Sequence, residues 1–157
     1  MIFAKLDAID ETNDLASSCG DHLLIWAWRR IAIGQVGCPL LPREFGEAFG
    51  DEAADVLAML QVFLHALEAA HWSQLQLGLP GGFSLTRDEE HALALLAAKQ
   101  SDDAPLFEHA IAHVARPELR HVLEITANGL AKAFALNGLS LGLVPKGAIC
   151  PQQNITS

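Results

Sequence analysis

Residues 51–72, DEAADVLAMLQVFLHALEAAHW, contain the most hydrophobic segment of the chain. Their apolar residues recur at spacings of three and four, the period of one helix face, and Asp51 stands at an N-cap position. The polar side chains Gln61, His65 and Glu68 fall on the opposite face. The segment therefore predicts a core helix whose apolar part is too short to span a bilayer.

Capping and stop signals on either side predict further helices. Asp21 is placed to cap the first of them, and Pro117 is placed in the first turn of the last. The best-marked start is at Thr86, because Thr86 and Glu89 have the spacing of a capping box. The predicted helices cover residues 21–33, 42–50, 51–72 and 86–100, a segment that begins at 103, and residues 117–137.

Two short segments alternate with a period of two instead, and both read L-x-L-G-L ahead of a proline. They predict extended arms at 75–79 and 139–144, which would pair as a small ribbon. The sequence leaves open whether the arms close two pseudo-symmetric three-helix halves. We expect one all-α domain over 1–157, a compact bundle of about six helices. Its parts are an N-terminal segment (1–20), two half-repeats (21–80 and 84–145) and a flexible tail (146–157).

Composition narrows the function classes. With 51% apolar and 18% charged residues, a chain of 157 residues buries a real core. Nineteen acidic against ten basic residues give a net charge of −9, which repels phosphate backbones and anionic lipid headgroups. We therefore expect neither a nucleic acid nor a membrane as partner.

Cysteine usage and the N-terminus predict a cytoplasmic protein. The first residues contain no long apolar stretch of the kind that marks a signal peptide. Cys19, Cys38 and Cys150 are odd in number and widely spaced, with no C-x-x-C pair, as expected for reduced thiols.

A metal-dependent or small-ligand-binding enzyme is the alternative that the sequence leaves open. Glu68-x-x-His71 and Glu118-x-x-His121 repeat the E-x-x-H spacing of carboxylate-bridged di-metal bundles. Helical periodicity places Glu68 and His121 on polar faces, whereas such a centre needs its ligands inside the bundle. We therefore predict no cofactor.

Other residues that could carry chemistry fit simpler roles. His109 and His113 are four apart, but the glutamate of H-E-x-x-H is missing between them, so they predict a solvated helix face. No nucleophile or phosphate-loop motif occurs, and we predict no catalytic residue.

The first helix carries the one feature that indicates an interaction. Its buried stripe includes Leu24 and Trp28, which places Trp26 on the other side together with Arg29 and Arg30. An exposed indole beside arginines has the composition of an interface centre, although a terminal segment that covers Trp26 would explain it equally. We expect a non-catalytic module that forms a homodimer or binds another protein through these three residues.

Overall fold

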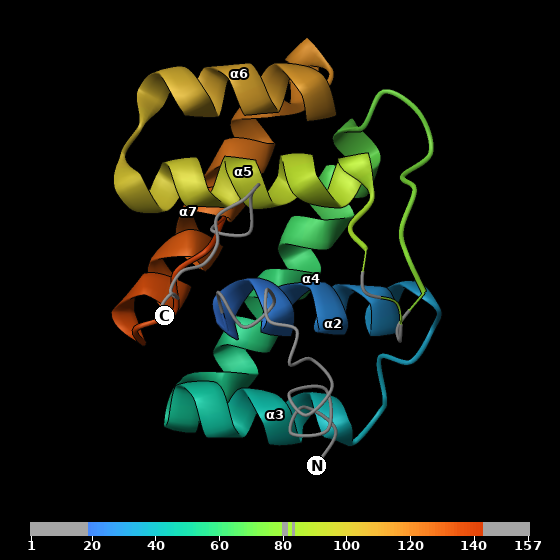
Figure 1. The fold of residues 1–157 in the computed structure, drawn as a ribbon, viewed down its shortest axis with the longest axis vertical. Coiled ribbons are helices and arrows are strands. Elements are labelled where there is room, and N and C mark those ends of the chain that lie inside the picture. Colours follow the sequence, from blue (N-terminus) through green and yellow to red (C-terminus); the bar gives the residue numbers. More distant parts are fainter. Residues whose placement is uncertain (1–18, 80–81, 83, 143–157) are drawn as a thin grey trace.

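The structure is a computed structural model that describes residues 19–79, 82 and 84–142. Its regular elements are all helical, and no strand occurs among the residues described, so the all-α prediction is confirmed (Figure 1). The helices are α2 (Cys19–Ala32), α3 (Leu40–Phe49), α4 (Ala53–Ala70), α5 (Arg87–Ser101), α6 (Ala104–Val114) and α7 (Arg120–Leu136), with the 3-10 turns η2 (Gly50–Glu52) and η3 (Pro117–Leu119). Residues 1–18 of the predicted N-terminal segment (1–20) and the whole predicted tail (146–157) lie outside the described residues.

The predicted start of α5 is confirmed in detail. The hydroxyl of Thr86 accepts a hydrogen bond from the backbone N–H of Glu89, and the Glu89 carboxylate accepts one from the backbone N–H of Thr86. This reciprocal capping box satisfies two N–H groups that have no partner within the helix. Asp103 likewise caps α6 by accepting from the backbone N–H of Leu106.

Two other predicted caps are wrong. α2 begins at Cys19, so Asp21 lies inside its first turn, and its Oδ1 accepts a hydrogen bond from the distant backbone N–H of Gly142 at 2.6 Å. Asp51 lies in the turn η2, and α4 follows Glu52 without a side-chain cap. A tertiary contact and an unpredicted 3-10 turn thus displaced both starts by about two residues, the usual uncertainty of helix ends.

The helices lie in two layers that two further helices close. α2 and α5 cross in front of α4 and α7, while α6 packs on α5 and α3 packs on α4 (Figure 1). α4 and α7 are antiparallel neighbours. At one end the backbone N–H of Arg116 donates to the Ala70 carbonyl at 2.8 Å, and at the other Asn137 Nδ2 lies 3.5 Å from Glu52 Oε1.

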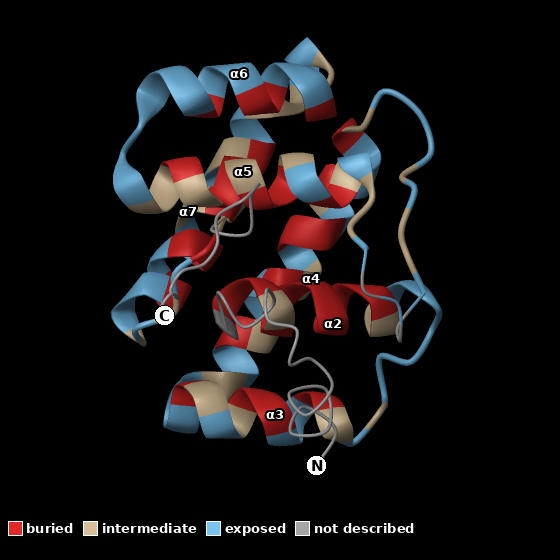
Figure 2. Cartoon of the chain, viewed as in Figure 1, coloured by how far each residue is buried: buried red, intermediate tan, exposed pale blue. Residues whose placement is uncertain are grey.

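Large side chains fill the centre between these layers. Phe45, Phe63 and Phe134 are fully buried, and the rings of Phe49 and Phe134 meet edge to face with centroids 5.0 Å apart. α2 contributes seven consecutive buried residues, 23–29, of which the first six are apolar, and together they cover almost two turns (Figure 2). α2 is therefore a central helix with little exposed surface.

The predicted arms do not form a ribbon in the part of the chain that the structure describes. Residues 74–79 are irregular, and residues 139–142 are held by the side chain of Gln100. That amide donates to the Leu139 carbonyl and accepts from the Leu141 N–H, both at 2.9 Å. The end of the second arm, 143–144, lies outside the described residues, and the pseudo-symmetry of the two halves remains a prediction.

Replacing Phe63 by alanine should lower the free energy of unfolding by about 3–5 kcal/mol, because the ring is fully buried and leaves a cavity. Urea unfolding followed by circular dichroism measures the change. Glu68→Ala on the exposed side of the same helix is the matched control and should stay within about 0.5 kcal/mol. Equal losses from both variants would contradict this placement of α4.

Candidate functional site

The most elaborate polar arrangement in the structure is a buried ion pair between α2 and α5. Arg29 Nη2 lies 2.7 Å from Glu89 Oε1 and Arg29 Nε lies 2.8 Å from Oε2, so the contact is bidentate. The side chains are 3% and 0% exposed. A pair this deep is stable only when every remaining donor and acceptor is also satisfied.

The segment between α4 and α5 satisfies those remaining groups. Arg29 donates its other N–H groups to the carbonyls of Leu79, Gly82 and Ser84 at 2.8–3.1 Å, so all five donors are used. Glu89 also accepts the N–H of Gly78, where a Cβ would lie 2.5 Å from Arg29. The ion pair thus fixes the path of a segment whose described residues have no regular structure.

The protonation of Glu89 follows from these contacts. Burial by itself would raise the pKa of the carboxyl, but hydrogen bonds from Arg29, Thr86 and Gly78, together with the charge of Arg29, hold the pKa below its ordinary value of 4.5. Since the folded pKa is depressed, Glu89 contributes stability at neutral pH and loses it as the pH falls through that lowered pKa.

The residues of the predicted interaction surface around Trp26 are mostly buried in the structure. Trp26 is 3% exposed, so the prediction that it lies partly in solvent is wrong, and Arg29 is committed to Glu89. A single buried stripe does not describe α2, because α2 is buried around most of its circumference. The alternative explanation, a terminal segment that covers Trp26, concerns residues outside those described. Arg30 does lie over the Trp26 ring, 5.4 Å from its centroid, and its Nη1 donates to Gln35.

The four predicted metal ligands are not brought together. His71 Nε2 contacts Asp88 Oδ1 at 3.2 Å, which fastens the end of α4 to the start of α5. Glu118 contacts Arg116 at 3.7 Å, while Glu68 and His121 are exposed, as helical periodicity predicted. Among the residues described, no three His, Cys, Asp or Glu side chains are placed to share a metal ion.

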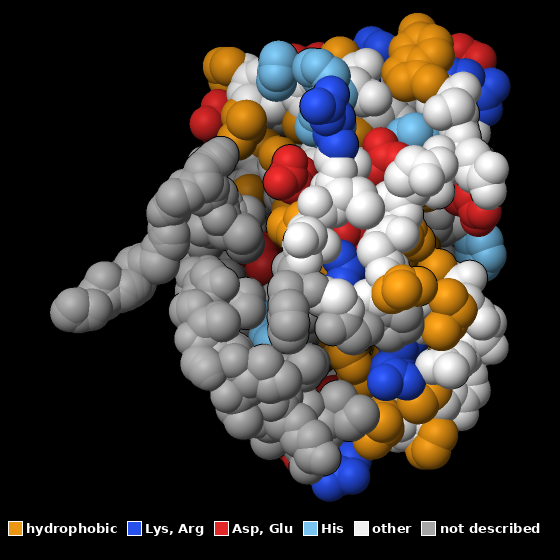
Figure 3. All heavy atoms as spheres, turned by 45° about the vertical axis from the view of Figure 1, so that its right-hand side comes forward, with side chains coloured by type: hydrophobic (Ala, Val, Ile, Leu, Met, Phe, Trp, Pro, Cys, Tyr) orange, Lys and Arg blue, Asp and Glu red, His pale blue; other side chains and the backbone are white. Residues whose placement is uncertain are grey.

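Three histidines, missed as a group by the sequence analysis, form a row between α5 and α6. The ring of His113 lies 4.6 Å from that of His109 and 4.8 Å from that of His91, between centroids. Figure 3 shows histidine side chains gathered at the end of the molecule where α6 lies. Burial, and then the electrostatic effect of His113, lower the pKa of His91 below its ordinary value.

An open cleft of about 680 Å³ lies between α2, α4 and the segment at 74–79. Its walls are mainly apolar, and Gln61, His65, Glu68 and Gln74 add polar groups. Arg29 also lines the cleft, but its donors are already used, so it offers no anion site. The cleft has room for a small amphipathic molecule. Its described residues do not combine into a set of side chains that would carry out a reaction on that molecule.

The outer side of the α4–α7 pair is unusually apolar for a surface. On α4 the stripe is Asp55, Met59, Val62, Ala66 and Ala69, and on α7 it is Val122, Ile125, Gly129, Lys132 and Leu136. Both repeat at alternating spacings of three and four, the pattern of a packed helix face. Met59, Val62, Val122, Ile125 and Leu136 are nevertheless 39–83% exposed. We call these two stripes the α4–α7 face.

The hydropathy of α4 agrees with this exposed stripe. The run Leu40–Ala70 is long and apolar enough to cross a membrane by length and composition, with a mean hydropathy of 1.4 in its most apolar window, yet only 33% of that window is buried. The run is not one straight rod, since the chain turns at Gly50 with φ 60°. A core helix that passes this test would be mostly buried, whereas α4 keeps a second apolar face outside.

Comparison with models of known protein families, with curated proteins and with solved structures finds no match for the chain. The function must therefore be inferred from its own residues and fold.

Replacing Arg29 by methionine should lower the free energy of unfolding by about 3–5 kcal/mol, because Glu89 is left buried and unpaired. Arg30→Met, one residue along the same helix, should cost less than about 1 kcal/mol. Urea unfolding of both variants measures the difference. An Arg29 variant as stable as the Arg30 variant would contradict the role given to the ion pair.

Lowering the pH should reduce the contribution of His91 to the free energy of unfolding. Because the folded pKa of His91 is depressed, its contribution to stability is complete above the ordinary histidine value of 6.5 and is lost as the pH falls through the lowered pKa. His91→Gln should therefore reduce the loss of stability between about pH 7.5 and about pH 5.5. His65→Gln, which replaces a histidine of the cleft, is the control. An unchanged pH dependence in His91→Gln would refute the assignment.

Proposed function

We propose that this protein is a non-catalytic helical association module that assembles with copies of itself through the α4–α7 face. The observation that carries the proposal is the pair of exposed apolar stripes on two neighbouring helices. Each stripe has the heptad-like spacing by which helices bury side chains against other helices. α4 and α7 already use their opposite sides for the core of the chain.

The energetics favour covering this face. Fully burying an aliphatic side chain contributes about 1.5–3 kcal/mol, and large side chains are exposed here along both helices. Scattered apolar residues on a surface need no explanation, but a contiguous apolar patch marks an interaction site. The two helices are packed antiparallel neighbours, and the contacts at their ends bring Val62 to about the level of Ile125, from which we infer that the two stripes form one patch.

A protein partner suits the face better than a lipid bilayer does. The two stripes contain a single cation, Lys132, and the chain carries a net charge of −9, so nothing attracts an anionic membrane surface. Narrow stripes with three-four spacing also match the side-chain interdigitation of a helix bundle. Trp26 and Arg29 have no part in this proposal, because both are buried.

Val62→Asp should raise the Kd of self-association by at least about tenfold, since it places a charge at the centre of the face. Sedimentation equilibrium of the wild type and the variant, up to about 200 µM, measures the change. Gln61→Asp introduces the same charge one residue away, on the side of α4 that lines the cleft, and should leave the Kd unchanged. A wild type that stays monomeric throughout, or a Kd insensitive to Val62→Asp, would refute the proposed function.

A further inference from the structure

We propose that the assembly is a twofold dimer whose axis runs along the α4–α7 face, so that α4 of each copy packs against α7 of the other in an antiparallel four-helix arrangement. This inference rests on the proposed function and specifies its partner and geometry. Three features of the face support it: the level of its residues along the two helices, its one glycine and the position of its two charges.

The levels of the residues follow from the contacts that close the two ends of the helix pair. Arg116 meets Ala70 at one end and Asn137 meets Glu52 at the other. Interpolating between these contacts places Met59 beside Gly129 and Asp55 near the level of Lys132. Both charges of the face are therefore at the same end, on different helices.

No contact or positive φ in the described part of the chain requires a glycine at position 129. Gly129 lies in the middle of α7 and is exposed, and a Cβ built on it would meet no atom within 4 Å. A glycine in a helix interior costs about 1 kcal/mol relative to alanine, so the position favours a use outside the chain. The missing side chain leaves a depression beside Met59, into which a side chain of a facing helix fits.

The two charges choose between the possible twofold axes. Within the part of the chain that the structure describes, neither Asp55 nor Lys132 forms an ion pair. If the twofold axis runs parallel to the two helices, each α4 faces the partner's α7, and the end of the face that carries the charges meets the same end of the partner. Asp55 then lies opposite the partner's Lys132, and the twofold axis repeats this contact. Rotation about an axis across the face would instead place both charges against the apolar end at Val122. Electrostatic complementarity selects the first axis.

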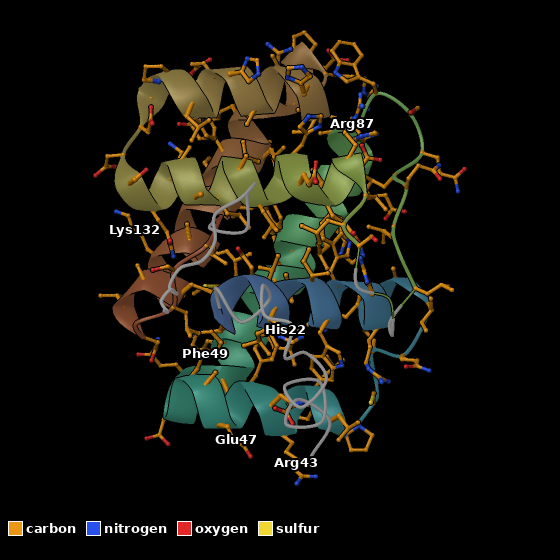
Figure 4. The ribbon with its side chains drawn as sticks, in the orientation of Figure 1. His22, Arg43, Glu47, Phe49, Arg87 and Lys132 are labelled. Atoms are coloured by element: carbon orange, nitrogen blue, oxygen red, sulfur yellow. The ribbon has the colours of Figure 1, made fainter. Side chains whose placement is uncertain are left out.

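The size of the face sets the expected strength of the dimer. α4 is about 27 Å long, and two helices side by side are about 20 Å wide. This footprint is smaller than the roughly 800 Å² per partner of a standard stable interface, so we expect a weak and reversible dimer. Figure 4 shows Lys132 on α7 at the left-hand edge of the molecule.

A charge exchange tests the geometry. In Asp55→Lys every dimer would set two lysines against each other at both ion-pair positions, and in Lys132→Asp it would set two aspartates against each other. Each variant alone should raise the Kd, measured by sedimentation equilibrium, by about tenfold or more. An equimolar mixture of the two should return to within about threefold of the wild type, because each mixed dimer regains both opposite-charge contacts.

The mixture supplies its own folding control, since a variant that fails to fold cannot rescue the other. Glu47→Lys makes the same charge change on the exposed side of α3 and should leave the Kd unchanged (Figure 4). Assembly that depends on Val62 but shows no rescue in the mixture would overturn the axis and leave the proposed function intact. A monomeric wild type that floats with phosphatidylcholine vesicles would overturn both, and would make the face a membrane surface.

Discussion

The ion pair between Arg29 and Glu89 is the constraint on which the rest of this structure depends. It joins α2 to α5 within the front layer, and the remaining donors and acceptors of its two side chains hold the segment that joins α4 to α5. The described residues of that segment form no helix or strand, so their backbone groups must find hydrogen-bond partners elsewhere. The side chain of Arg29 thereby supplies hydrogen bonds that a helix or strand would otherwise provide in a connection of this length. It also fixes the position of the segment that forms one wall of the cleft.

The sequence predicted the helices well because their signals are local. The Thr86 capping box, the three-four periodicity of α4 and the prolines at helix starts depend on neighbours a few residues away. Arg29 and Asp21 bind partners far away in the sequence, and such contacts leave no local signal. Arg29 was therefore predicted to lie on an interaction surface, and Asp21 was predicted to cap a helix. Six consecutive apolar residues, 23–28, indicate in the sequence that α2 is central. Assigning a single buried face to the helix overlooked this indication.

The α4–α7 face shows a second limit of periodicity. Met59 fits the apolar stripe of α4 on a helical wheel, and the sequence analysis had no means to separate a stripe that faces the core from one that faces a partner. The distinction needs the positions of α3 and α7 around α4. Conversely, the spacing of the two E-x-x-H repeats resembles that of a metal site in the sequence. In the structure His71 contacts Asp88, and Glu118 lies in the separate turn η3. Spacing along a helix identifies a face, and only packing tells what that face meets.

The separation of Arg29 from Glu89 along the chain has a consequence for how the protein is made. The two residues are 60 positions apart, so α2 leaves the ribosome well before α5 exists to receive its guanidinium. Until then the six apolar residues of α2 have no completed core around them, and closing so long a loop is slow compared with forming a helix. Nascent chains that stop short of α5 therefore expose the most buried helix of the finished protein, and this is the stage at which chaperone binding would protect it best.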